Sequence, residues 1–180
     1  KEAYGTSGPR FLVRFFAGNA LNEDLCDSPN AITQAYEDGV PMGATIDASS
    51  MSNLRIFVSA TADASLEDQY LAKVQIIKGV LKDGELSTTI VDVVNNEDTK
   101  LDYSTCEVIG KGKKSMCTVW QDPAFDNQDN AYYYARIVAN KSCRWSHQLC
   151  ISNPEYCEDD SEFETPKFIQ ERAWTSPAVS

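Results

Sequence analysis

Most apolar residues of this chain fall in short runs in which apolar and polar positions alternate or β-branched residues follow one another. Such runs are typical of β-strands, because successive side chains of a strand point to opposite faces of its sheet. Gly, Pro and Asp residues that favour turns separate the runs. The pattern therefore predicts a fold of antiparallel strands. The expected strands are residues 10–17, 53–62, 71–81, 86–94, 107–109, 116–122, 131–139 and 171–175.

Two pairs of neighbouring strands are predicted to form hairpins. Asp83-Gly84 lies between 71–81 and 86–94, and this dipeptide is a strong signal for a two-residue hairpin turn. The polar, Lys-rich stretch 110–114 lies between 107–109 and 116–122 and is predicted to be the tip of a second hairpin.

Only one segment has the signals of a helix. Residues 29–37 are preceded by Ser28 as a candidate N-cap, begin with Pro29 and are followed by Gly39 as a stop signal. A parallel sheet would need helices between its strands, so we expect an all-β fold. The specific expectation is an immunoglobulin-like β-sandwich with long loops, one short helix and disulfide staples.

The length of 180 residues suits one domain that buries its own core, so a single sandwich domain over 1–180 is expected. Residues 1–16 begin polar and become strongly apolar, which fits two arrangements. They form either the first strand of their own sandwich or an extended arm that adds to the sheet of a neighbouring copy, with Phe11, Val13 and Phe15 as the candidate assembly residues. Residues 140–170 are expected to be a Cys-rich, acidic loop region. The chain opens with Lys1 rather than Met, so we expect a processed or partial chain.

Charge excludes several classes of partner. The chain has 27 acidic residues against 16 Lys and Arg, which gives a net charge of −11. Nucleic acids and anionic membrane surfaces bind basic patches, so neither is an expected partner. No apolar stretch approaches the ~18 residues of a membrane span.

Six cysteines indicate a disulfide framework and an oxidising compartment, either extracellular, at the cell surface or periplasmic. Cys106 and Cys117 flank the second predicted hairpin and are predicted to pair with each other. Cys26 is then predicted to join one of the remaining three, and the spacing of those three does not match the close pairs of zinc sites. The cysteines are Cys26, Cys106, Cys117, Cys143, Cys150 and Cys157.

The remaining candidate sites are weak. His147, the only histidine, follows Ser146 directly, and adjacent residues rarely form a catalytic pair, so a structural role is expected. Neither a catalytic residue nor a cofactor is therefore assigned. The oxygen-rich stretch with Asp122, Asp126 and Asp129 is a weak calcium candidate, with a turn capped by Asp side chains as the alternative.

Two further patterns concern sugars. Asn140-Lys141-Ser142 is a sequon, so Asn140 is a candidate glycosylation site, and Ser and Thr elsewhere can carry O-linked sugars. Tyr132 and Tyr134 would share one face of a strand and Tyr133 the other. These three tyrosines, together with Trp120 and Trp145, are candidates for a sugar-stacking surface, with ordinary sandwich packing as the alternative.

Several blocks along the chain resemble the family called domain of unknown function 3604. They are residues 2–10 (EAYGTSGPR) running into 14–16 (RFF), 39–43 (GVPMG), 74–79 (VQIIKG), 120–125 (WQDPAF), 132–137 (YYYARI), 143–146 (CRWS) and 170–177 (QERAWTSP). The resemblance implies the C-terminal part of large, often exported bacterial proteins similar to PHP-type metal-dependent phosphoesterases. The metal-binding residues of that family would lie upstream, so none is assigned here.

The expected function is therefore not enzymatic. We expect a secreted structural module that self-associates into an oligomer or filament, with attached glycans. The alternatives are an accessory domain of a phosphoesterase-like hydrolase and a carbohydrate-binding module.

Overall fold

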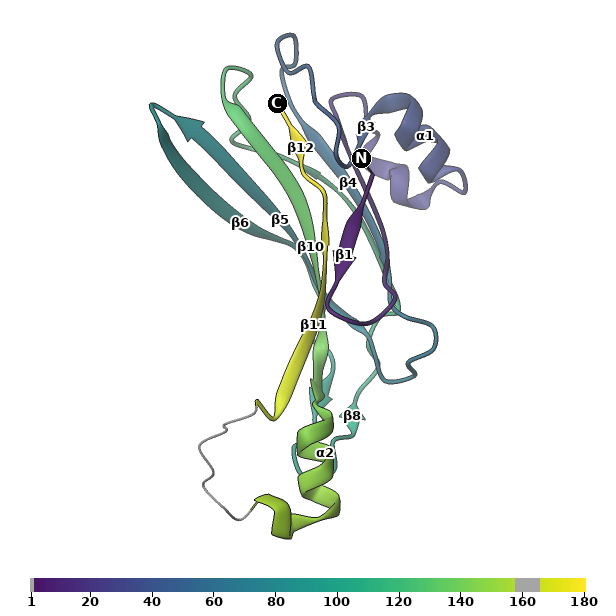
Figure 1. The fold of residues 1–180 in the computed structure, drawn as a ribbon. Coiled ribbons are helices and arrows are strands. Elements are labelled where there is room, and N and C mark those ends of the chain that lie inside the picture. Colours follow the sequence, from purple (N-terminus) through teal and green to yellow (C-terminus); the bar gives the residue numbers. More distant parts are fainter. Residues whose placement is uncertain (1, 158–165) are drawn as a thin grey trace.

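A computed structural model describes residues 2–157 and 166–180 of the chain (Figure 1). Two antiparallel sheets form the body of the molecule. The large sheet contains β1 (Tyr4–Thr6), β5 (Leu71–Lys82), β6 (Glu85–Asn95), β10 (Asn130–Cys143), β11 (Phe168–Thr175) and β12 (Ala178–Val179). The small sheet contains β2 (Leu12–Gly18), β3 (Val40–Pro41), β4 (Arg55–Thr61) and β9 (Ser115–Gln121).

The strand order of the large sheet is β1-β11-β10-β5-β6, with β12 beside β10, and that of the small sheet is β3-β2-β4-β9. A separate ribbon pairs β7 (Lys100–Leu101) with β8 (Val108–Ile109). The helical elements are η1 (Glu23–Asp27), α1 (Ala31–Asp38), α2 (Trp145–Ser152) and η2 (Pro154–Cys157). Among the described residues, no helix has the length and apolar character that crossing a membrane requires.

The two sheets pack face to face around one core, as in immunoglobulin-like sandwiches. Alternate residues of β2 and β4 meet alternate residues of β5 and β10 there, in agreement with the period of two. The all-β prediction is confirmed. Phe11, Val13 and Phe15 belong to this core and are almost completely buried.

The first predicted hairpin is confirmed. β5 and β6 pair from Lys82 and Glu85 to Lys73 and Asn95. Asp83 and Gly84 connect them with φ angles of 54° and 82°. Positive φ at both central residues defines the turn whose twist matches antiparallel strands.

The second predicted hairpin is wrong. β8 pairs with β7, whereas β9 pairs with β4. The central residues of β4 are buried on both faces, so this strand needs a partner at each edge, and β9 occupies the edge that β2 leaves open. Residues 110–114 are therefore a connection rather than a hairpin tip. The ammonium group of Lys114 donates to the carbonyls of Leu66, Glu67 and Gln69 at 2.6–2.8 Å.

The disulfide prediction fails for the same reason. Cys117 pairs with Cys26, and Cys106 pairs with Cys143. With β8 and β9 in different sheets, Cys106 and Cys117 are not opposite each other. Cys150 is also disulfide-bonded, and the side chain of Cys157 lies outside the described residues. The described disulfides fit an oxidising, non-cytoplasmic compartment.

The helices differ from the prediction of a single helix over 29–37. α1 begins two residues later than expected, because the Ser28 hydroxyl accepts from the Asn30 N–H in a turn before the helix. It ends at Asp38 with Gly39 as C-cap. α2 was not expected, and it buries none of its residues. Two disulfides tether this helix: that of Cys143, the last residue of β10, and that of Cys150 within the helix.

The outer face of the small sheet is covered. Phe16 and Phe57 point away from the main core and pack against Leu21, Leu25 and Ala35 of the segment that contains η1 and α1. The Cys26–Cys117 disulfide joins η1 to β9 across this second cluster.

Replacing both Cys26 and Cys117 by Ser should lower the free energy of unfolding by about 2–4 kcal/mol, because the unfolded chain loses a crosslink. Replacing Cys106 and Cys143 should cost less, since the bridged residues are 37 rather than 91 positions apart. Denaturant unfolding followed by Trp fluorescence measures both. A larger loss for the Cys106–Cys143 variant would contradict this order.

Asp63 joins the segment before β2 to the loop after β4. One carboxylate oxygen accepts from the Ser65 hydroxyl and N–H at 2.6 and 2.9 Å, and the other accepts from the Arg10 N–H at 2.8 Å. These hydrogen bonds, that of the Ser65 hydroxyl foremost, lower the pKa of Asp63 from 3.8 to about 2.

Because the folded pKa of Asp63 is lowered, its contribution to stability is complete above the unfolded pKa of 3.8 and disappears as the pH falls towards about 2. Asp63→Asn should therefore lower the melting temperature at neutral pH and reduce the loss of stability between these two pH values. Thermal unfolding across this pH range measures the effect. If the melting temperature of the variant falls with decreasing pH as steeply as that of the unmodified chain, the prediction is wrong.

Candidate functional site

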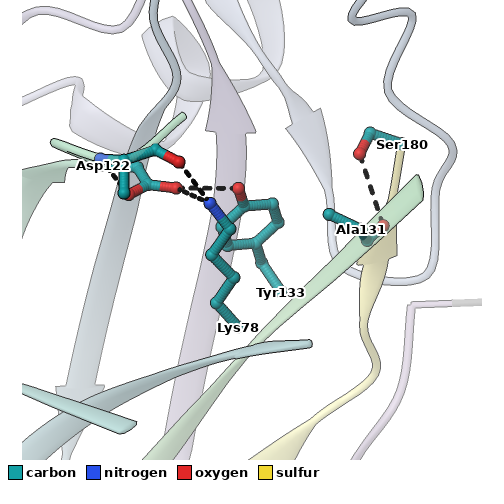
Figure 2. Close-up of polar contacts among 6 residues, drawn as sticks. Lys78, Asp122, Ala131, Tyr133 and Ser180 are labelled. Atoms are coloured by element: carbon teal, nitrogen blue, oxygen red, sulfur yellow. Dashed lines mark hydrogen bonds and ion pairs between the residues drawn. The ribbon is translucent and has the colours of Figure 1, made fainter. Parts of the chain in front are cut away.

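A polar cluster lies buried between the two sheets (Figure 2). Lys78 on β5 and Tyr133 on β10 are register partners, and both side chains point towards Asp122, which follows β9. One Asp122 oxygen accepts from Lys78 Nζ and from the Tyr133 hydroxyl, each at 2.8 Å. Lys78 Nζ also donates to the Ala124 carbonyl at 2.7 Å. Lys78 and Asp122 are only 8% and 5% exposed. Each therefore neutralises the charge of the other at a place that is largely shielded from water.

This cluster determines the role of the candidate calcium ligands. The second Asp122 oxygen accepts from the Ala124 N–H, so both of its carboxylate oxygens are engaged within the protein. Asp126 caps a turn by accepting from the Gln128 N–H. The calcium interpretation is therefore not supported, because an ammonium group already neutralises Asp122. Burial and the Asp122 carboxylate raise the pKa of Tyr133 far above its usual 10, so this hydroxyl stays protonated as a donor.

His147 contacts a backbone carbonyl and an aromatic ring, which fits the structural role expected from the sequence. Its Nε2 atom lies 2.9 Å from the Tyr103 carbonyl, and its ring meets Phe168 edge-on. Cys106, Cys143 and His147 form the one group of potential metal ligands found among the described residues. The two cysteine sulfurs are bonded to each other, so they are not thiolate ligands.

Asn140 is unsuited to carry a glycan. It is 7% exposed. Its side-chain oxygen accepts from the Tyr70 N–H at 2.8 Å, and its side-chain nitrogen donates to the Asp68 carbonyl at 3.1 Å. A sugar on that nitrogen would have to displace these contacts and enter the protein interior. Exposed Ser and Thr residues remain the candidate positions for attached sugars.

The outer face of the large sheet carries an aromatic surface that no described segment covers. Tyr132 and Tyr134 lie on this face, as the sequence predicted, while Tyr133 lies in the core. Their rings are 6.3 Å apart and nearly parallel. Gly79 lies opposite Tyr132, and a Cβ at this position would overlap the Tyr132 ring. Trp174 on β11 is 37% exposed and extends the surface. We call Tyr132, Tyr134 and Trp174 the aromatic platform.

A polar ladder continues the same face beyond the aromatic platform. Arg136 Nε donates to the Gln75 side chain at 2.7 Å, and Gln75 donates to Asp92 at 2.6 Å. Lys73 then bridges Asp92 and Glu97 at 3.2 and 3.4 Å. These contacts cross β10, β5 and β6 and hold their side chains in fixed positions.

The edge of the large sheet at β6 is open. β6 pairs with β5 on one side and with no described strand on the other. Figure 1 shows the β5–β6 hairpin at the margin of the molecule opposite α1. β6 has 11 residues, of which none is Lys, Arg or Pro, the residue types that commonly block sheet edges. Its Leu86 and Ile90 are 60% and 53% exposed.

The open β6 edge and Trp174 were not identified from the sequence as site residues. Exposed Leu and Ile in an alternating strand are indistinguishable from core positions until the sheet order is known. The three residues proposed for assembly, Phe11, Val13 and Phe15, lie in the chain's own core, which is the first-strand arrangement left open above.

Fold and site define a class of protein: a disulfide-bonded antiparallel sandwich with one covered and one open outer face. The chain matches the family described as "Protein of unknown function (DUF3604)" over residues 1–179, and it belongs to that family. Neither a curated protein nor a solved structure matches it.

The buried ion pair yields a stability prediction. Lys78→Met alone should lower the free energy of unfolding by about 3–5 kcal/mol, because it leaves the Asp122 carboxylate buried without its counter-charge. The double variant Lys78→Met, Asp122→Leu should recover most of that loss. Denaturant unfolding of the two single variants and the double variant measures the coupling, and strictly additive losses would contradict it.

Proposed function

We propose that this chain is a non-catalytic extracellular module that self-associates head to tail into filaments. The observation that carries the proposal is the open edge of β6. A strand with unpaired backbone N–H and C=O groups along its length is a template for pairing with another strand. The long, uncharged run of β-branched and small polar residues from Ser87 to Val91 favours such pairing.

The partner edge lies at the other end of the same sheet. β1 pairs only with β11 among the described strands, through Tyr4, Gly5 and Thr6. The N-terminal segment is further held by hydrogen bonds from the Ser7 N–H to the Arg172 carbonyl and from the Ser176 N–H to the Ala3 carbonyl. No other described strand pairs with β1, so β1 of one copy can lie beside β6 of the next.

Contact between two different edges determines the form of the assembly. A contact between unlike surfaces does not close on itself unless its rotation completes a ring, so it generates an open filament. The sheet would then continue from copy to copy while each core stays intact. This arrangement assigns assembly to β1 and β6, and it leaves Phe11, Val13 and Phe15 inside their own domain. The disulfides favour an extracellular or cell-surface location, because disulfides form and persist in oxidising compartments.

Replacing Ile90 by Lys should abolish filaments, because a charge at the β6 edge must be desolvated when another strand pairs there. Deleting residues 1–9 should abolish them as well, because it removes β1. Ile109→Lys is the matched control, since Ile109 is 57% exposed and lies in the β7–β8 ribbon. Negative-stain electron microscopy of the purified chains measures the effect.

Two outcomes would contradict the proposal. If the unmodified chain is strictly monomeric over a wide concentration range, it is not an assembly module. If it forms a closed dimer that Ile90→Lys disrupts and the deletion of 1–9 does not, β6 pairs with β6, and the head-to-tail arrangement is wrong.

A further inference from the structure

We propose that the outer face of the large sheet binds an acidic saccharide. Its carboxylate or sulfate groups would bind a cationic cleft, and its sugar rings would stack on the adjoining aromatic platform. This inference does not depend on filament formation, because it concerns the face of the sheet, whereas assembly is assigned to the edges.

The cationic cleft has a volume of about 420 Å³ and lies over β5, β10 and β11. Four of the 16 Lys and Arg residues line it, and Glu97 is its one acidic lining residue. The sign of the local charge is therefore opposite to the net charge of −11. At physiological salt the Debye length is about 8 Å, so a bound ligand interacts mainly with this local charge. The four cations are Lys73, Arg136, Lys141 and Arg172.

Two of these cations have no polar side-chain partner in the part of the chain that the structure describes. Lys73 is paired with Asp92 and Glu97, and Arg136 is oriented by its bond to Gln75. Lys141 and Arg172 are exposed, and neither side chain has an ion pair or hydrogen bond to a described residue. Arg172 pairs with Val138 in the sheet register, next to the Arg136–Trp174 pair, so its guanidinium lies beside the aromatic platform. A guanidinium group binds carboxylate and sulfate oxygens through two parallel hydrogen bonds.

A second, apolar cleft adjoins the cationic one. Its volume is about 410 Å³, and its lining includes the aromatic platform together with Thr175 and Pro177. Trp174 lines both clefts, so the two form one continuous surface. The C–H face of a pyranose ring is flat and apolar and packs against an aromatic ring. Tyr132 is held flat over Gly79, so little side-chain freedom is lost when a sugar stacks there.

Acidic saccharides fit this combination better than other anions. A neutral sugar would stack on the aromatic platform but would form no ion pair with the cations of the cleft. An acidic peptide would use the cations but has no obligatory ring to stack on Trp174. A nucleic acid duplex carries closely spaced phosphates over a length greater than the cleft. Phosphates beyond the four cations would be repelled by the acidic surface of the rest of the protein. A chain of carboxylated sugars supplies rings and charges at the spacing of single sugar units.

The test is calorimetric titration of the full chain with three probes of equal length: oligogalacturonate, the corresponding neutral oligogalactoside, and oligoglutamate. We expect oligogalacturonate to bind at least about tenfold more tightly than either of the others, and its binding to weaken with added salt. Arg172→Gln and Trp174→Ala should each weaken it about tenfold, through the lost charged hydrogen bonds and the lost stacking surface respectively.

Matched control variants are available for both residues. Lys111→Gln removes an exposed cation and Trp145→Ala an exposed indole, 69% accessible, and both lie outside the two clefts. Neither should change the dissociation constant. Arg172 is exposed, so its variant tests the site even if Trp174→Ala destabilises the sheet.

Three results would overturn the proposal. One is the absence of binding by oligogalacturonate. Another is equal binding of the neutral probe without any effect of Arg172→Gln, which would identify a neutral sugar surface. The third is equal or tighter binding of oligoglutamate that Trp174→Ala does not affect, which would identify a site for acidic peptides.

Discussion

The pairing of β5 with β10 is the interaction on which the rest of the molecule depends. These two strands stay in register from Leu81 and Asn130 to Lys73 and Val138. Their inner faces supply the buried Lys78 and Tyr133 as well as much of the core. Their outer faces supply the two tyrosines of the aromatic platform and the Lys73, Gln75 and Arg136 side chains of the polar ladder. β6 and β11 are added to either side of this pair, so both the open edge and the cationic cleft are positioned by it.

Local features of this structure could be predicted from the sequence, whereas the choice of strand partners could not. The alternation of residues correctly separates Tyr133 from Tyr132 and Tyr134, and Asp83-Gly84 identifies its hairpin, because both depend on backbone geometry within a few residues. β9 also follows β8 closely in the chain, but it pairs with β4, which needs a partner at an edge. Because β9 pairs with β4 rather than with β8, Cys117 lies beside Cys26 and not beside Cys106.

The two outer faces of the sandwich explain why the site lies on the large sheet. Phe16 and Phe57 lie on the outer face of the small sheet, but η1 and α1 cover them, and a disulfide holds that cover in place. The equivalent positions of the large sheet carry Tyr and Trp together with Arg and Lys. These side chains have apolar rings or stems and polar ends, so they tolerate water while still offering surface to a ligand.

The buried ion pair is best understood as a constraint on register. Two charges removed from water add little net stability, because their desolvation offsets much of their attraction. A shift of β5 by one residue, however, would turn Lys78 to the outer face and leave Asp122 buried without a counter-charge. The same shift would turn Gly79 to the core and remove the space in which the Tyr132 ring lies. We infer that Lys78 and Asp122 make this misregistered pairing unfavourable and so hold the aromatic platform in its position on the opposite face.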